Sequence, residues 1–220
     1  MNAEPPATPP THRLRRIRKF AWISVAFMTM LFVGIYGWRV YQDANPPTAK
    51  QVARAAINSE FELLNHHGIT VTGETYRGKW QIVFFGYTYC PDICPTTLNT
   101  IAETLDALGD DAEQVAPLFI TVDPKRDTPA ILAEFVAAFH PKLIGLTGTQ
   151  AQIKAAAHAF KAYYSKAEQP DAPDGYLMGH SGYIYLMTPE GEFESLFTDQ
   201  RDTSAKIAAA IRIRLKNKKD

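Results

Sequence analysis

The two cysteines of the chain, Cys90 and Cys94, stand four residues apart just after a nearly continuous apolar run over residues 81–88. Such a run is typical of a strand buried on both faces, and Pro95 suits the first turn of a helix that follows it. The unpaired N–H groups and the dipole of a helix N-terminus favour a thiolate. The pair therefore predicts one of two chemistries, disulfide exchange or the binding of a soft metal ion.

The spacing of the cysteines is compatible with both chemistries. Four positions along a helix place two Cα atoms roughly 6 Å apart, within the range of a disulfide. The spacer between the sulfurs also leaves room for an ion. Pro95 disfavours helical dihedral angles at the residue before it, so we expect Cys94 at the helix cap. Two buried, inert cysteines are the structural alternative.

A metal ion held by two thiolates usually takes a third ligand, and the chain has six histidines. His180 lies in Met178-Gly179-His180-Ser181-Gly182, after a Pro/Asp-rich loop and directly before a predicted strand. A loop in that place could face the cysteines, although spacing alone leaves its role open. The other histidines have simpler explanations. His12 lies in the N-terminal arm, and His66 and His67 precede Gly68 in a predicted exposed turn. His140 ends a predicted helix, whose carbonyls we expect it to cap, and His158 lies on the surface of another.

The N-terminal region predicts a membrane anchor. Residues 20–38 are 19 consecutive uncharged, mostly apolar positions, and five basic residues precede them. As a helix this stretch would measure roughly 28 Å, close to the hydrocarbon core of a bilayer. It is longer than the apolar core of a signal peptide, and no small-residue cleavage site follows it. The positive-inside rule then predicts a single-pass protein of the bacterial cytoplasmic membrane, with a cytoplasmic arm over 1–19 and a periplasmic domain.

The formal net charge of zero conceals an uneven distribution. Residues 40–220 carry 17 basic and 22 acidic side chains. This mildly acidic balance argues against nucleic acid as a partner, because phosphate binding needs a concentrated basic surface. In an oxidising periplasm a lone cysteine pair is free to cycle, and there are no further pairs for a disulfide scaffold.

The remaining chain predicts one α/β domain over 60–220, after a linker over 39–59 whose prolines cannot continue a helix. Apolar runs predict strands near 61–64, 68–76, 81–88, 115–122, 143–147, 183–187 and 192–197. Helices are expected from Pro95, from Pro129 after Asp127-Thr128, from the capping box Thr149 to Gln152, and over 204–215. This alternation implies a central mixed sheet covered by helices on both faces.

Three segments in order resemble the Sco/SenC family. The first is Phe84-Phe85-Gly86-Tyr87-Thr88-Tyr89-Cys90-Pro91-Asp92-Ile93-Cys94-Pro95-Thr96, and the second is Thr121-Val122-Asp123-Pro124-Lys125-Arg126-Asp127-Thr128-Pro129. The third is His180 with the strand and the turn Pro189-Glu190-Gly191 that follow it. The resemblance covers about residues 61–215 and includes the single N-terminal anchor.

This resemblance implies a thioredoxin-like fold and a membrane-tethered protein that serves the dinuclear copper centre of cytochrome c oxidase. Its copper ligands would be Cys90, Cys94 and His180. Gly179 departs from the family, because many members have an acidic residue before the ligand histidine. Met178 is a soft thioether, and packing explains it more simply than copper binding. We interpret Asp127 as part of a helix cap and Asp123 as a residue that orders the loop beside the thiols.

Two functions follow from this set of residues. The first is a copper chaperone rather than an enzyme, since thiolates favour Cu(I) and imidazole also accommodates Cu(II), although zinc accepts the same ligands. It would deliver copper to the copper-centre subunit of the oxidase and exchange copper or electrons with other periplasmic copper carriers or thiol reductants. The second is a thiol–disulfide reductase in which Cys90 attacks and Cys94 resolves. A thioredoxin-superfamily peroxidase is a more distant alternative, because no arginine stands close to Cys90 in sequence.

Overall fold

A computed structural model describes residues 11–44, 48, 53, 54, 56–198 and 201–217. The chain divides into two units, Met1–Thr48 and Ala49–Asp220. We describe each unit by itself.

The first unit contains one long helix, α1 (Thr11–Ala44). Its segment Trp22–Tyr41 is long and apolar enough to cross a membrane, by length and composition. The helix extends beyond the predicted span of 20–38 at both ends, so the predicted linker from residue 39 is wrong for its first six residues. Nothing between Arg39 and Ala44 breaks a helix, because the first proline beyond it is Pro46.

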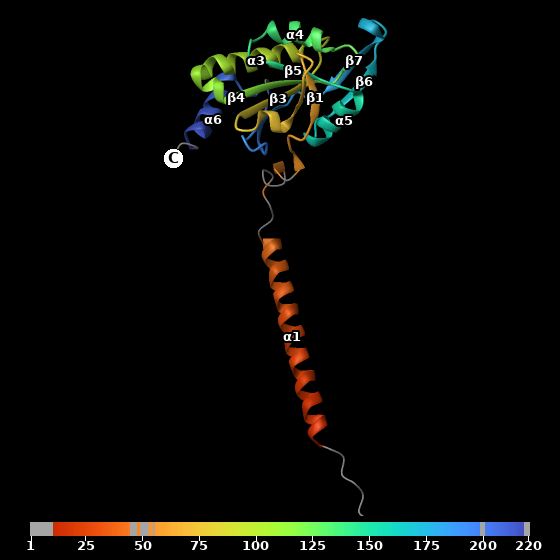
Figure 1. The fold of residues 1–220 in the computed structure, drawn as a ribbon, viewed down its shortest axis with the longest axis vertical. Helices are drawn as coiled ribbons and strands as arrows, with labels where there is room; N and C mark the ends of the chain where they lie inside the picture. Colours follow the sequence, from red (N-terminus) through yellow and green to blue (C-terminus); the bar gives the residue numbers. More distant parts are fainter. Residues whose placement is uncertain (1–10, 45–47, 49–52, 55, 199–200, 218–220) are drawn as a thin grey trace, which may run out of the picture. The chain divides into compact units, whose positions relative to one another are not determined.

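The second unit is built on a seven-stranded mixed sheet in the order β2-β1-β5-β4-β3-β8-β9 (Figure 1). The central strands β3, β4 and β5 are parallel to one another, and the other neighbours pair antiparallel. The strands are β1 (Glu62–Asn65), β2 (Thr70–Thr72), β3 (Trp80–Gly86), β4 (Val115–Thr121), β5 (Ile144–Thr147), β8 (Ile184–Met187) and β9 (Phe193–Phe197). The predicted strand over 68–76 is only partly correct, because β2 gives way to a 3-10 helix at Gly73–Tyr76.

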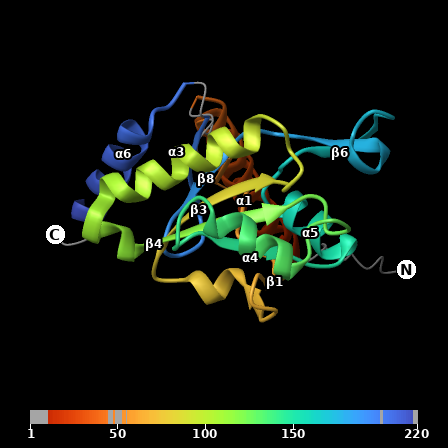
Figure 2. The ribbon, with the colours of Figure 1, turned by 90° about the horizontal axis from the view of Figure 1, so that it is seen from above.

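Helices cover both faces of the sheet. They are α3 (Ile93–Leu108), α4 (Pro129–Ala137), α5 (Gln150–Ala159) and α6 (Ser204–Asn217), with short 3-10 helices at Gly109–Gln114 and Pro173–Gly175. In Figure 2 α6 lies beside α3, and these two helices pack together. Phe135 of α4 contacts Phe119 on the face that carries α3, whereas Phe160, the cap after α5, contacts Phe85 on the opposite face.

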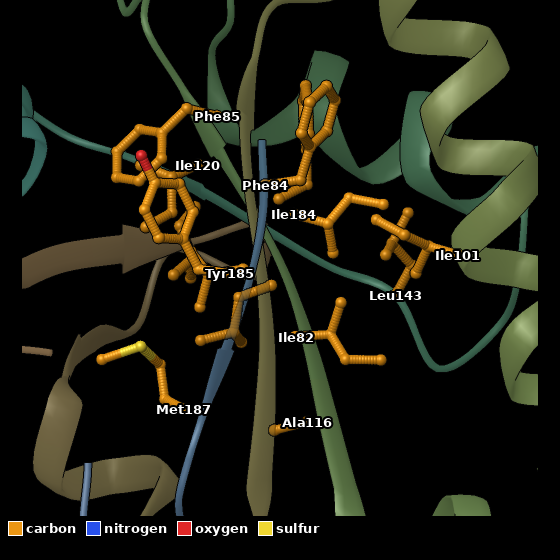
Figure 3. Packing of buried hydrophobic residues seen from close by; sticks show 14 of the residues in the cluster. Ile82, Phe84, Phe85, Ile101, Ala116, Ile120, Leu143, Ile184, Tyr185 and Met187 are labelled. Atoms are coloured by element: carbon orange, nitrogen blue, oxygen red, sulfur yellow. The ribbon is translucent and has the colours of Figure 1, made fainter. Parts of the chain in front are cut away.

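The core has two layers because side chains alternate across the strands. Figure 3 shows Phe84 and Ile184 on one side of the strands with Ile101 of α3. Phe85 and Tyr185 lie on the other side. Every residue of β3 and β4 is buried, as expected for the centre of a sheet covered on both faces. These two strands therefore give a rigid base to the cysteine turn, the segment over residues 87–92 between β3 and α3.

A separate hairpin, β6 (Tyr164–Glu168) with β7 (Tyr176–His180), projects from the domain in both ribbon views (Figures 1 and 2). The predicted Pro/Asp-rich loop connects the two strands, at residues 169–175, whereas the loop expected around His180 is wrong, because these residues end β7. The two strands themselves are not predicted, because β6 is mostly exposed and β7 contains a glycine, so neither shows the apolar alternation by which strands are recognised. In the described chain the two strands pair with each other and with no strand of the main sheet.

Candidate metal centre

The first element of the site is the turn between β3 and α3. The Cys90 amide donates to the Tyr87 carbonyl at 3.3 Å, which tightens the turn directly after the strand. Helix α3 then begins at Ile93 with Asp92 as its cap, so Cys94 lies in the first turn and not at the predicted cap position. Pro95 is tolerated there because N–H groups in a first helical turn have no partner within the helix.

The Cys94 thiol fits into a space that requires a glycine at the end of β3. A Cβ atom added to Gly86 would lie 2.7 Å from the Cys94 sulfur and 2.8 Å from the Phe119 ring. Both distances are shorter than real contacts. Cys94 is fully buried, and Cys90 is 9% exposed. Cys90 is thus the more accessible of the two sulfurs.

The third donor comes from the end of the projecting hairpin. The His180 Nε2 atom lies 3.1 Å from the Cys94 sulfur and 3.9 Å from the Cys90 sulfur. Its ring packs edge-on against Phe84 and Tyr87, with centroids 5.9 and 5.8 Å apart. Nδ1 lies 3.3 Å from the Ser181 carbonyl, and a proton on Nδ1 would leave the Nε2 lone pair facing the thiols.

The donor atoms have the spacing that a soft metal ion requires. In the described part of the chain, Cys90, Cys94 and His180 form the one group of three potential ligands, with all donor atoms within 4.8 Å of one another. Metal–sulfur bonds of about 2.3 Å and metal–nitrogen bonds of about 2.0 Å hold such atoms roughly 3.5–4 Å apart. Small side-chain adjustments would therefore enclose an ion, and the three residues fit a copper-type ligand set.

The two thiols differ strongly in protonation. The hydrogen bond from Cys94 lowers the pKa of Cys90 to about 4, with help from His180 and from the backbone N–H groups of Asp92 and Cys94. Burial, together with the donated hydrogen bond to Cys90, raises the pKa of Cys94 far above its usual value. The metal-free centre therefore holds one thiolate and one thiol, and an ion that binds both sulfurs must displace the Cys94 proton.

The two aspartates of the second motif have structural tasks. Asp127 is not a helix cap, because Thr128 caps α4 by accepting from the Ile131 amide. The Asp127 carboxylate instead accepts from the amide and hydroxyl of Thr88, at 3.1 and 2.6 Å, just before the cysteines. Asp123 pairs with Arg126 and accepts from the Tyr176 hydroxyl at 3.1 Å. The motif thus braces the cysteine turn and joins it to the hairpin.

The other described histidines do not belong to this ligand group. His66 accepts from the Gly145 amide at 2.9 Å, with His67 against its ring. The His140 ring accepts from the Lys142 amide at 3.1 Å, and it is the His140 backbone amide that caps a carbonyl of α4, that of Val136, at 3.2 Å. His158 is exposed, as expected for the surface of α5. The side chain of His12 lies outside the described residues.

Position 179 faces the opposite side of β7 from its neighbours Met178 and His180. Met178 is buried in the hydrophobic core, whereas Gly179 is exposed and nearest to Ser165. Because side chains alternate along a strand, an acidic side chain at position 179 would point away from the face that carries His180. The departure from the family pattern at Gly179 therefore leaves the ligand geometry intact.

Fold and site together define a thioredoxin-like protein in which two cysteines and a histidine converge as potential metal ligands. Residues 49–216 match the family model described as SCO1/SenC. A curated relative, protein sco1 of Schizosaccharomyces pombe, is 37% identical over 187 residues, which cover 81% of this chain and 71% of that protein. The chain belongs to the SCO1/SenC family.

Solved structures of relatives agree with the fold. Arabidopsis thaliana ScoI with copper bound has a TM-score of 0.68 and 39% identity, and the match covers 74% of this chain and 99% of that one. Bradyrhizobium japonicum ScoI with copper bound has a TM-score of 0.66 and 41% identity, covering 71% and 98%. The bound copper was observed in those two relatives.

Proposed function

We propose that the protein binds one copper ion through Cys90, Cys94 and His180 and delivers it during the assembly of cytochrome c oxidase. The observation that carries the proposal is the convergence of one imidazole and two sulfurs within 4.8 Å. Thiolates favour Cu(I), and the imidazole also suits Cu(II). Two relatives with the same fold have been solved with copper bound, which supports copper over zinc as the cargo.

Delivery requires that the ion can leave the centre. Cys90 is the more accessible ligand and already a thiolate, so acceptor thiols can replace it first. Cys94 is buried beneath the turn and would release the ion last, when its proton returns. The acceptor we propose is the copper-centre subunit of the oxidase, as the family resemblance implies. Other periplasmic copper carriers would supply the ion.

The unequal thiols also favour a second candidate function, the reduction of a disulfide in the acceptor. The Cys90 thiolate would attack one acceptor sulfur and expel the other as a thiolate. Cys94, after losing its proton, would attack the Cys90 sulfur and release the second acceptor thiol. The acceptor gains two electrons, and the protein is left with a Cys90–Cys94 disulfide that a thiol reductant must reopen.

We propose that α1 anchors the protein in the bacterial cytoplasmic membrane, with the arm over 1–19 in the cytoplasm and the second unit in the periplasm. The apolar segment Trp22–Tyr41 and the five basic residues before it support this orientation. In that compartment the protein would meet both an oxidising environment and the copper-binding domain of its acceptor.

Replacement of His180 by alanine separates the two functions. We expect His180→Ala to weaken Cu(I) binding by at least about a hundredfold, because loss of a ligand exceeds the 10–100-fold effect of second-shell changes. The Cys90–Cys94 disulfide should still form. Affinity is measured by competition with a chromophoric Cu(I) chelator, and disulfide formation by thiol counting.

His158→Ala is the matched control, because His158 is exposed on α5 and lies outside the ligand group. Its copper affinity should equal that of the original protein. An unchanged affinity in His180→Ala would refute the three-ligand centre.

A further inference from the structure

Arg126 is a buried cation that contacts three segments around the metal centre. Its side chain is 6% exposed and pairs with Asp123 on its own loop. The guanidinium carbon lies 4.8 Å from the Tyr89 ring centroid and 5.7 Å from that of Tyr87, both in the cysteine turn. It also lies 3.9 Å from the ring centroid of Tyr176, at the start of β7. Arg126 therefore connects the cysteine turn with the strand that ends in His180.

Tyr176 is held at several points. Arg126 donates to its backbone carbonyl at 3.4 Å, and its hydroxyl donates to Asp123 at 3.1 Å. The Lys166 ammonium lies 4.2 Å from its ring centroid, so a second cation from β6 contacts the same ring. The end of the hairpin next to its connecting turn, where Tyr176 pairs with Glu168, is thus fixed to the second motif by side chains and a backbone carbonyl.

Tyr87 completes the connection at the other end of β7. Its ring meets the His180 ring edge-on at 5.8 Å. Two sets of contacts therefore link Arg126 to His180. In one, Arg126 contacts Tyr176 of β7, the strand that ends in His180. In the other, Arg126 contacts the Tyr87 ring, which packs against the His180 ring.

These contacts matter because the main sheet does not hold the hairpin. In the described chain β6 and β7 pair only with each other, whereas the cysteines stand at the end of the central strand β3. A two-stranded hairpin is marginally stable by itself. Side-chain contacts of β7 with the second motif and with Tyr87 therefore help to set the distance between His180 and the sulfurs, and Arg126 is at their centre.

We propose that Arg126 is a positioning residue for the metal centre, which sets the place of the His180 imidazole relative to the cysteine sulfurs. The proposal rests on the proposed copper binding at Cys90, Cys94 and His180. It requires an arginine, because a planar guanidinium stacks on aromatic rings while it pairs with a carboxylate, and a lysine ammonium cannot do both with the same geometry.

A double-mutant cycle tests the proposal on the full-length protein. Arg126→Lys keeps the charge beside Asp123 but removes the planar stacking. We expect it to weaken Cu(I) binding about tenfold, as second-shell changes do. In the His180→Ala background the same substitution should cause no further loss, because the residue through which Arg126 acts is absent. The imidazole-nitrogen hyperfine pattern of the Cu(II)-loaded protein should also change in Arg126→Lys.

Arg214→Lys is the matched control, since Arg214 donates two hydrogen bonds to Glu194 from α6, away from the metal centre. It should leave copper affinity and the hyperfine pattern unchanged. If Arg126→Lys does not fold, Tyr176→Phe replaces it in the cycle. That variant removes one hydroxyl and keeps the ring beneath Arg126, and we expect a smaller loss of affinity that also disappears in the His180→Ala background.

Two results would overturn the inference. One is an equal loss of affinity with and without His180, which would show that Arg126 only supports the fold. The other is an unchanged affinity and hyperfine pattern in Arg126→Lys. Both leave the proposed function standing, provided that His180→Ala itself weakens binding. The proposed function fails separately, if the original protein does not bind copper or if His180→Ala binds it equally well.

Discussion

Cys90 and Cys94 lie four residues apart, and yet the pKa of Cys90 is lowered to about 4 while the pKa of Cys94 is raised far above its usual value. The difference arises from position, because Cys94 is enclosed beneath the turn and donates its proton toward Cys90. The Cys94 amide also points at the Cys90 sulfur, at 3.4 Å. For a copper carrier this arrangement provides one ligand ready to bind and one that binds only with proton release, so affinity should rise with pH.

The thiolate character of Cys90 predicts an unusual pH profile for its alkylation. Because its pKa is about 4, the reactive thiolate persists below neutrality, and the rate should fall only as the pH drops toward 4. An ordinary thiol would instead lose reactivity below about pH 8.5. The rate of reaction with iodoacetamide, followed by mass spectrometry between pH 3 and 9, measures this profile.

Two controls belong to that experiment. Cys94→Ala should move the midpoint upward, because the hydrogen bond from Cys94 is the largest cause of the lowered pKa. The denatured protein should show the ordinary thiol midpoint. A midpoint near 8.5 in the folded protein would contradict the proposed inequality of the two thiols.

At the scale of elements, the strands of the main sheet were largely predictable from the sequence. Residues 81–88 and 115–122 form apolar runs too long and continuous for exposed segments, and they become the buried strands β3 and β4. The capping box at Thr149 and the turn at Pro189-Glu190-Gly191 mark the start of α5 and the β8–β9 hairpin. These signals are local, so a sequence displays them directly.

The details of the site depended on contacts that no local pattern displays. The cysteine pair and His180 were predictable as candidates, whereas the hairpin that carries His180 was not, because β6 is polar and mostly exposed and β7 contains a glycine. Asp127 and Thr128 are both good caps by residue type. Only the fold shows that Thr128 caps the helix while Asp127 turns inward to Thr88. Arg126 was visible in the motif, but its role depends on tyrosines from two other segments.

The end of β3 offers a sharp test of how the turn positions Cys94. Gly86→Ala would push a methyl group against the Cys94 sulfur and the Phe119 ring. We expect a loss of about 1–3 kcal/mol in the free energy of unfolding, as for other overpacked cores, together with weaker copper binding. Denaturant unfolding and chelator competition measure the two effects.

Gly179→Ala is the matched control for that substitution. A Cβ atom at Gly179 would lie 3.3 Å from the Ser165 hydroxyl as its nearest neighbour, and Gly179 is exposed. Stability and copper binding should therefore change little. If Gly86→Ala behaved like Gly179→Ala, the close packing of Cys94 against the strand would be disproved.

At the scale of the whole molecule, the two units have different tasks. The family model begins at residue 49, where the second unit also begins. The first unit contains the candidate span, and the second contains all three proposed ligands. Under the proposed function, attachment would belong to the first unit and copper binding to the second.

The two cysteines make the proposed orientation directly testable, since the chain has no others. In spheroplasts a membrane-impermeant maleimide should label Cys90 without permeabilisation, because the second unit would lie outside the cytoplasmic membrane. Mass spectrometry identifies the labelled residue.

For comparison, Ala7→Cys in a chain without Cys90 and Cys94 should be labelled only after the membrane is opened. This position belongs to the basic arm, which the positive-inside rule places in the cytoplasm. Labelling of Cys90 only after permeabilisation would reverse the proposed topology.

The sulfur of Cys94 and the imidazole of His180 meet across 86 residues of chain. Closing so long a loop has an entropic cost that folding must overcome before the contact exists. A growing or partly unfolded chain thus presents the cysteine pair without its third partner, and would hold copper less tightly than the complete centre. Tight occupancy of the centre becomes a signal that the domain has finished folding, so an acceptor would receive copper only from mature molecules.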